Sequence, residues 1–265
     1  MGAIRKYIIA NSKKMRVMKR FFKIATNFLF LKNKKLRTAN YLISGFALIY
    51  IGLIIYPNIL FGYSVKYKSF HIFSNNPIDY NINKIIDDTE TNLSSSEIYE
   101  QNITHKVFLC NSYSLYTFFV PFSRRAFACN YPLINNTFIA KSNIAKNESY
   151  KNDAKDNYIR KLSETVAHEI THAMTEKKLG LWKYITLENW KNEGYSETIG
   201  YNDTLNMAIV KDFLKINKNN DGYRVHYRKC YFAVAYLMQI EKMKFEDIVA
   251  TKLTLDEVLK KIETK

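Results

Sequence analysis

The hydrophobic pattern of the chain begins with a run that holds no charged residue between Arg37 and Lys66. Its core, residues 41–56, is almost wholly apolar, and with the residues that follow it reaches about twenty, enough for one helix to cross the hydrocarbon core of a bilayer. Aromatic residues at both ends suit the two membrane interfaces. The pattern predicts a transmembrane anchor over residues 41–63. A buried core helix and a cleaved signal peptide are the two alternatives.

Beyond this run the pattern turns polar and then changes between strand-like and helix-like segments. Residues 64–104 are rich in Asn and Ser and are interpreted as a connector, with one short helix near residues 82–89. Two runs with β-branched and aromatic side chains, residues 106–110 and 137–140, predict strands. From residue 159 onward apolar residues recur at spacings of three and four, which predicts a buried helix. They are Ile159, Leu162, Val166, Ile170, Ala173 and Met174.

Helical patterns dominate the rest of the chain. The buried helix should end near Gly180, because glycine favours the position after a helix C-terminus. Further helices are expected over residues 188–213, 225–243, 245–249 and 255–262. A small sheet together with these helices predicts an α+β fold for residues 105–265, behind one N-terminal transmembrane helix.

The net charge of +16 is concentrated at the N-terminus. Residues 1–40 hold twelve Lys and Arg and no acid, and the first acidic residue is Asp79. Since +12 of the +16 lies in this arm, the remaining chain carries only +4, which argues against a nucleic-acid-binding domain. Lys and Arg that flank a membrane span stay in the cytoplasm. We therefore expect residues 1–40 to form a basic cytoplasmic arm and the domain after Lys68 to be extracytoplasmic.

The most specific chemistry lies in residues 168–172, which read HEITH. Histidines four apart lie one above the other on a helix face, so the imidazoles of His168 and His172 can reach one metal ion. Glu193 offers a carboxylate as a third ligand, which gives a zinc site with one open position for water. Glu169 lies beside the metal without ligating it and is the expected general base. The alternative is a polar helix face whose histidines meet solvent or each other.

These motifs resemble a known superfamily. The zinc motif with its downstream glutamate is similar to that of the gluzincin metallopeptidases, the group that includes thermolysin. Residues 190–197, which read WKNEGYSE, resemble the gluzincin glutamate helix, and residues 227–237 resemble a helix of bacterial peptidase-MA-like domains. The resemblance covers residues 100–250 and implies a zincin-like catalytic domain with one Zn²⁺ ion.

Two supporting roles follow from the same motifs. Glu197 lies one helical turn beyond Glu193, where it can accept a hydrogen bond from the outer nitrogen of a ligating histidine. In the thermolysin pattern this position is an aspartate. By resemblance of its helix, Tyr227 is expected to stabilise the oxyanion, with His226 and Tyr223 as alternatives.

Together these features predict a membrane-anchored zinc metallopeptidase that hydrolyses a peptide or protein substrate. By the same resemblance, residues 137–141 are expected to form a wall of the substrate cleft and to pair with the substrate as an added strand. The alternative is a catalytically inactive zinc-binding or scaffold protein that keeps the zincin fold. Glu169 argues against this alternative, because a metal site alone does not need a base.

The cysteines leave two interpretations open. An exported domain could form a bridge between Cys110 and Cys129, which would leave Cys230 over. Equally, all three can be small buried apolar residues. Their spacings match no zinc knuckle.

Overall fold

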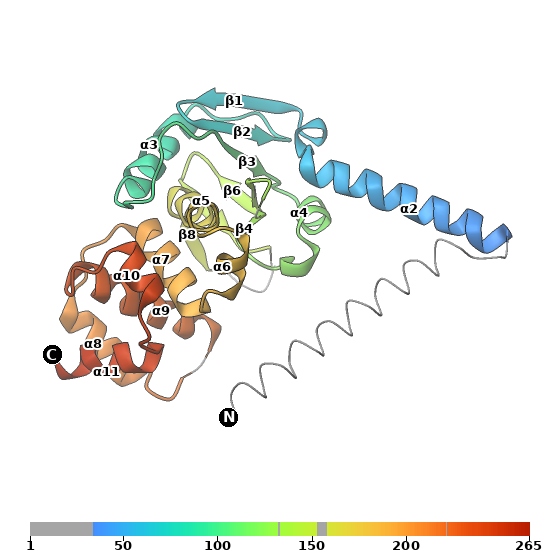
Figure 1. Ribbon diagram of the computed structural model, residues 1–265. Coiled ribbons are helices and arrows are strands. Elements are labelled where there is room, and N and C mark those ends of the chain that lie inside the picture. Colours follow the sequence, from blue (N-terminus) through green and yellow to red (C-terminus); the bar gives the residue numbers. More distant parts are fainter. Residues whose placement is uncertain (1–33, 132, 153–157, 221) are drawn as a thin grey trace. The chain divides into compact units, whose positions relative to one another are not determined.

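The computed structural model describes residues 34–131, 133–152, 158–220 and 222–265. Most of the predicted basic arm, residues 1–33, therefore lies outside the described residues. The chain divides into two compact units, Met1–Pro57 and Asn58–Lys265. The described strands all belong to the second unit, where they combine with helices in a mixed α and β fold (Figure 1).

The first unit contains one long apolar helix, α2 (Lys34–Ile55). Its window Thr38–Ile55 has a mean hydropathy of 1.8 and is long and apolar enough to cross a membrane. Only 6% of this window is buried, which disfavours the alternative of a core helix, whereas a signal sequence passes the same test. The predicted end of the span at residue 63 is wrong for the helix. Pro57 cannot continue it, and a 3₁₀ turn (Pro57–Leu60) follows.

A five-stranded sheet forms one layer of the second unit. Its order is β1-β2-β3-β5-β4, in which the two inner pairs are parallel and the two outer pairs are antiparallel. The strands are β1 (Tyr63–Tyr67), β2 (Phe70–Ser74), β3 (His105–Leu109), β4 (Ala128–Tyr131) and β5 (Asn136–Ile139). A second sheet of three short antiparallel strands contains β6 (Lys141–Asn143), β7 (Glu148–Tyr150) and β8 (Ile159–Lys161).

The segment interpreted as a connector, residues 64–104, is instead part of this folded unit. It supplies β1, β2 and the helix α3 (Ile82–Leu93). Ile82, Ile85, Ile86 and Leu93 recur at helical spacing and are buried. They join the main hydrophobic core together with residues of α5 (Leu162–Leu179), against which α3 packs. Burial of this apolar face makes the segment a structural layer of the domain.

The strand expected beside the substrate is also placed differently. Residues 136–139 form β5, which pairs with β3 on one side and with β4 on the other. All four of its residues are buried. The edge strands of this sheet are β1 and β4, so the expectation that residues 137–141 pair with substrate is wrong for the part in β5, and the edge strand next to β5 is β4, residues 128–131.

The sheet order also decides between the two interpretations of the cysteines. Cys110 directly follows β3, whereas Cys129 lies in β4, and β5 separates the two strands. Two strand spacings amount to about 9.5 Å, which exceeds the Cα separation of about 7 Å that a disulfide can span. All three cysteines are free thiols, and Cys110 and Cys230 are buried. The bridge between Cys110 and Cys129 is therefore not formed.

Helices make up the remaining layers. A short helix α4 (Tyr113–Phe119) follows β3, and α5 lies between the large sheet and the C-terminal helices (Figure 1). α5 ends at Leu179, and Gly180 follows it with a positive φ of 75°, as the sequence predicts. The later helices are α6 (Leu181–Thr186), α7 (Asn189–Tyr201), α8 (Met207–Ile216), α9 (Tyr223–Gln239), α10 (Phe245–Ala250) and α11 (Leu255–Thr264).

The single helix expected over residues 188–213 is in fact two helices. Asn202 ends α7 in the left-handed conformation, with φ at 50° and ψ at 34°. Asn is one of the few residues besides Gly that adopts this conformation readily. Asn206 then caps α8, because its side chain accepts hydrogen bonds from the backbone N–H groups of Ala208 and Ile209.

The contact between α7 and α9 depends on a glycine. A Cβ atom at Gly194 would lie 2.4 Å from the carbonyl oxygen of Cys230 and 2.5 Å from a methyl carbon of Val234. The first of these is backbone and cannot turn away. Only glycine therefore allows the two helices to approach this closely.

We predict that Gly194→Ala destabilises the chain by about 1–3 kcal/mol, the usual cost of overpacking. Without the close contact the same change would stabilise a helix interior by about 0.5–1 kcal/mol, so the sign of the effect is decisive. Thermal unfolding of the full chain in detergent measures it. Gly62→Ala is the matched control, because an added Cβ at Gly62 meets nothing within 4 Å.

Candidate metal centre

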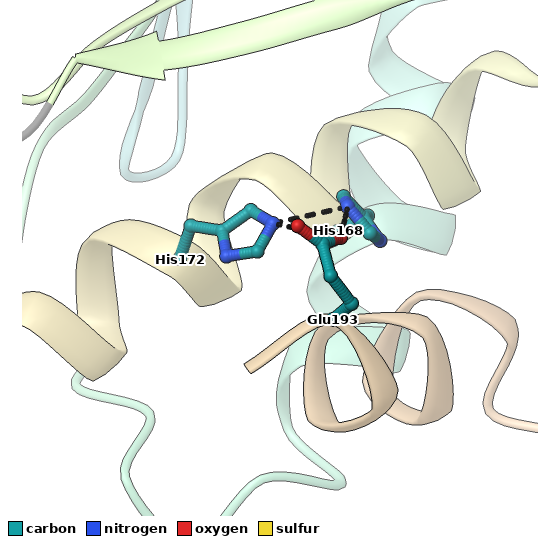
Figure 2. A group of neighbouring side chains, drawn as sticks. All are labelled: His168, His172 and Glu193. Atoms are coloured by element: carbon teal, nitrogen blue, oxygen red, sulfur yellow. Dashed lines mark hydrogen bonds and ion pairs between the residues drawn. The ribbon is translucent and has the colours of Figure 1, made fainter. Parts of the chain in front are cut away.

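Two helices bring the three predicted ligands together. His168 and His172 lie one turn apart on α5, and Glu193 lies on α7, which packs against α5. Figure 2 shows the three side chains converging from these helices. The two Nε2 atoms are 3.1 Å apart, and each lies 3.6 Å from Oε2 of Glu193. These residues form a group that could hold a metal ion.

The distances fit a tetrahedral zinc ion. Bonds of about 2.0–2.1 Å at tetrahedral angles place the ligand atoms roughly 3.3 Å apart. The observed separations of 3.1 and 3.6 Å lie on either side of this value. Two imidazoles and one carboxylate are also a donor set that zinc commonly takes, with a fourth position left for water.

Hydrogen-bond partners fix the protonation of Nδ1, the nitrogen of His172 that faces away from the centre. Its Nδ1 lies 3.2 Å from the side-chain oxygen of Asn192 and 3.2 Å from the hydroxyl of Ser196. The amide oxygen of Asn192 can only accept, so the proton of His172 belongs on Nδ1 and its Nε2 lone pair faces the centre. The sequence analysis did not identify Asn192 or Ser196, although both lie in the motif around Glu193.

His168 provides a second argument for a cation. Its Nε2 lies 3.1 Å from Nε2 of His172, so without an ion these two nitrogens can stay this close only if one of them carries a proton. Its Nδ1 is buried, has no hydrogen-bond partner, and lies 3.6 Å from the carboxylate of Glu197. With a cation on Nε2, the proton of His168 lies on Nδ1 and faces Glu197 favourably.

A buried ion pair fixes the position of Glu197. Arg160 approaches both of its oxygens, with Nη1 to Oε1 at 3.0 Å and Nη2 to Oε2 at 2.8 Å. Only 10% of the Arg160 side chain and 4% of the Glu197 side chain are exposed, so neither charge has a substitute partner in water. Arg160 lies in β8, two residues before α5 begins. The sequence analysis missed it, because nothing local links a lone arginine to a glutamate 37 positions away.

Burial sets the electrostatics of the histidines. Burial lowers the pKa of His168 well below its usual value, and the neighbouring His172 and Arg160 lower it further. For His172, burial acts in the same direction, but Glu193, together with Glu169 and the side chain of Asn192, outweighs it and raises the pKa to about 9. In the absence of an ion, His172 and Glu193 therefore share a proton as an ion pair. A proton and a metal ion compete for the same Nε2 lone pair.

Glu169 lies beside the triad rather than in it. Its side chain is buried and lines the same cavity as the three candidate ligands. Burial raises the pKa of this carboxyl to about 7, although a hydrogen bond from the backbone N–H of Asn130 in β4 acts in the opposite direction. A carboxyl with this pKa can both take and release a proton near neutral pH.

The cavity in front of the triad has a volume of about 580 Å³. Residues of β4, β8, α5, α7 and α9 line it. Tyr223 and Tyr227 both reach it, and their ring centroids are 4.5 Å apart. Burial raises the pKa of both phenols, so both remain protonated donors. His226 does not line the cavity, and its Nε2 instead lies 3.6 Å from the sulfur of Cys230.

Comparison with known proteins adds no identification. No protein-family model matches the chain, and no curated protein matches it. The candidate metal centre is therefore defined by its own geometry. The donor set, the ligand separations and the orphaned nitrogen of His168 all fit one bound cation.

We predict one zinc ion per chain and at least a tenfold loss of zinc affinity in His172→Ala, about the cost of removing even a residue that only hydrogen-bonds to a metal ligand. The physical reason is the loss of one of three ligand atoms. Metal analysis after dialysis against limiting zinc measures the content of each variant. His226→Ala is the matched control, since this histidine lies outside the cavity and should keep full zinc. Full occupancy in His172→Ala would contradict the ligand set.

Proposed function

We propose that the chain is a membrane-anchored zinc metallopeptidase of the gluzincin type that hydrolyses peptide bonds. One observation carries the proposal. A buried carboxyl, Glu169, lies beside the group His168, His172 and Glu193 in a single cavity. A site that only binds metal has no need of a fourth ionisable group with a pKa near neutrality.

The residues divide the work between holding the ion and moving protons. His168, His172 and Glu193 would hold zinc, which supplies Lewis acidity for the substrate carbonyl and for water. Glu169 takes the proton of the attacking water and then passes it to the leaving amine. Arg160 holds the carboxylate of Glu197 in place behind His168 through two hydrogen bonds.

A phenol of α9 serves the developing oxyanion. Tyr227 is the first choice and Tyr223 the second, because both line the cavity as protonated donors. A hydrogen bond that strengthens as charge develops on the carbonyl oxygen lowers the barrier without tightening substrate binding.

The edge of the sheet favours an extended peptide as the substrate. Ala128, Cys129 and Asn130 of the edge strand β4 line the cavity, and Asn130 contacts the proposed base. An edge strand offers unpaired backbone groups, so a peptide can add to it as a further strand beside the metal centre. We therefore assign to β4 the pairing with substrate that was expected for residues 137–141.

The decisive experiment compares wild type with Glu169→Gln on a peptide library. We predict that the variant keeps zinc and fold but loses hydrolysis by at least about 10²-fold, because an amide cannot take the proton of water. Mass spectrometry of the products and metal analysis give the two readouts. Glu188→Gln is the matched control, as an exposed glutamate of the same unit outside the cavity. Activity of Glu169→Gln within a few fold of wild type would contradict the mechanism. Zinc binding without hydrolysis in either protein would favour the inactive scaffold.

The anchor and its orientation form a separate prediction. The twelve cations before the span should keep the N-terminus in the cytoplasm, since each costs about 2.5–3.5 kcal/mol at the centre of the bilayer. A reporter fused after Lys265 should work only if it functions outside the cytoplasm, whereas one inserted after Arg37 should show the opposite pattern. The chain should remain in the membrane pellet after a carbonate wash. A cytoplasm-active fusion after Lys265 would contradict the orientation, and full release would contradict the anchor.

A further inference from the structure

The cavity contains cations that the metal centre does not use. Four basic side chains line it, namely Lys151, Arg160, Arg224 and Arg228. The acids that line it are Glu169, Glu193 and Glu197, and each is already engaged in the metal centre or in the pair with Arg160. Among the residues that the structure describes, the charged side chains of the cavity outside the metal centre and the Arg160–Glu197 pair are therefore all positive.

Arg228 is the cation with the clearest unused capacity. Its guanidinium carbon lies 5.3 Å from the ring centroid of Tyr201 and 5.0 Å from those of Tyr231 and Phe232. These ring contacts are its interactions in the described part of the chain, where it forms neither an ion pair nor a hydrogen bond. The rings hold the guanidinium plane, but they offer its five N–H donors no hydrogen-bond acceptor from the protein.

A second guanidinium shares the same ring. Arg160 lies 5.2 Å from the centroid of Tyr201, so Arg160 and Arg228 both contact one tyrosine that itself lines the cavity. Arg160 uses Nη1 and Nη2 for Glu197, but its Nε is buried and has no hydrogen-bond partner. The cavity lining thus holds two arginines with N–H donors that have no acceptor among the described residues. This is a built site that lacks an anionic acceptor.

We propose that Arg228 binds a carboxylate of the peptide substrate, in the cavity that Arg160 also lines, and makes the site selective for acidic peptides. The inference rests on the proposed peptidase function and names its substrate class. A planar guanidinium matches a carboxylate in a bidentate geometry, and the surrounding rings strengthen the pair by excluding water. The carboxylate can come from an Asp or Glu side chain or from the C-terminus of the peptide, since both present the same group.

Binding to the inactive variant tests the site without relying on catalysis. The full chain carrying Glu169→Gln, loaded with zinc in detergent, is titrated with three synthetic peptide sets in which X is a mixture of uncharged residues. The first is acetyl-X₃-Glu-X₃-amide, the second replaces Glu by Gln, and the third keeps Gln but ends in a free carboxylate. We expect the first or the third set to bind at least about tenfold more tightly than the second, the size expected for a hydrogen-bonded charge. Which of the two gains identifies the source of the carboxylate.

Substitutions then assign the preference to Arg228. Adding Arg228→Gln should reduce the discrimination to within about twofold, whereas Arg228→Lys should retain part of it, because the charge remains and the bidentate geometry is lost. Lys229→Gln is the matched control, a cation of the same helix that lies outside the cavity and should leave the discrimination intact. If Arg228 only packs on its rings, Arg228→Gln lowers the unfolding temperature but leaves the peptide preference unchanged, and the proposal is overturned.

Hydrolysis of the same three sets by wild type separates the two proposals. Cleavage of all sets without any charge preference in binding overturns the carboxylate site and leaves the peptidase intact. Discrimination through Arg228 without cleavage of any set supports the carboxylate site and contradicts the peptidase. Absence of binding by every set overturns the carboxylate site.

Discussion

The burial of four ionisable side chains between two helices is the constraint on which the rest of the structure depends. His168, His172, Glu169 and Glu193 all lie inside the domain, and burying such groups without a shared partner is costly. A cation at the point where two nitrogens and one oxygen converge resolves most of this cost. The neighbouring contacts support the same point. Asn192 and Ser196 fix the tautomer of His172, and Arg160 fixes the position of the Glu197 carboxylate.

Close helix packing makes this convergence geometrically attainable. α7 must approach α5 on one side and α9 on the other, and glycines occupy both contacts. At Gly194 an added Cβ would meet the backbone of Cys230, and at Gly200 it would lie 3.1 Å from the carbonyl oxygen of Glu164 and 3.3 Å from Cβ of His168. The contact at Gly200 therefore places α7 directly against the candidate ligand His168. Small residues on α7 therefore link the stability of the helical layer to the geometry of the metal centre.

Local pattern predicted the parts of the fold that local physics determines. Helical periodicity identified α5 from Leu162 to its end at Gly180, whereas Ile159, expected in the same helix, lies in strand β8. The spacing of the two histidines identified one face of that helix. The apolar face of α3 was visible as a short helix within residues 64–104, but its burial against α5 depends on tertiary contact. The order of strands is also a property of the whole sheet, so a buried central strand and an edge strand could not be distinguished by composition.

The candidate site shows the same division between local and long-range information. The ligands lie in two short motifs and could be predicted, whereas their partners could not. The role of Arg160 depends on its ion pair with Glu197 and cannot be predicted locally, since an arginine before a helix is ordinarily solvated. The contact of β4 with Glu169 likewise requires the folded sheet.

The net charge of the chain does not describe the charge of its cavity. Of the net charge of +16, +12 lies in the N-terminal arm. The remaining +4 suggests a domain with no strong electrostatic preference. The cavity contradicts that impression, because its acids are committed to the metal centre and to Arg160 while Arg228 retains its donors. A ligand in an enclosed site responds to the groups that line it, since bulk water screens the distant arm but not a neighbouring guanidinium. The selectivity of such a cavity is therefore set by which charges the fold leaves unpaired.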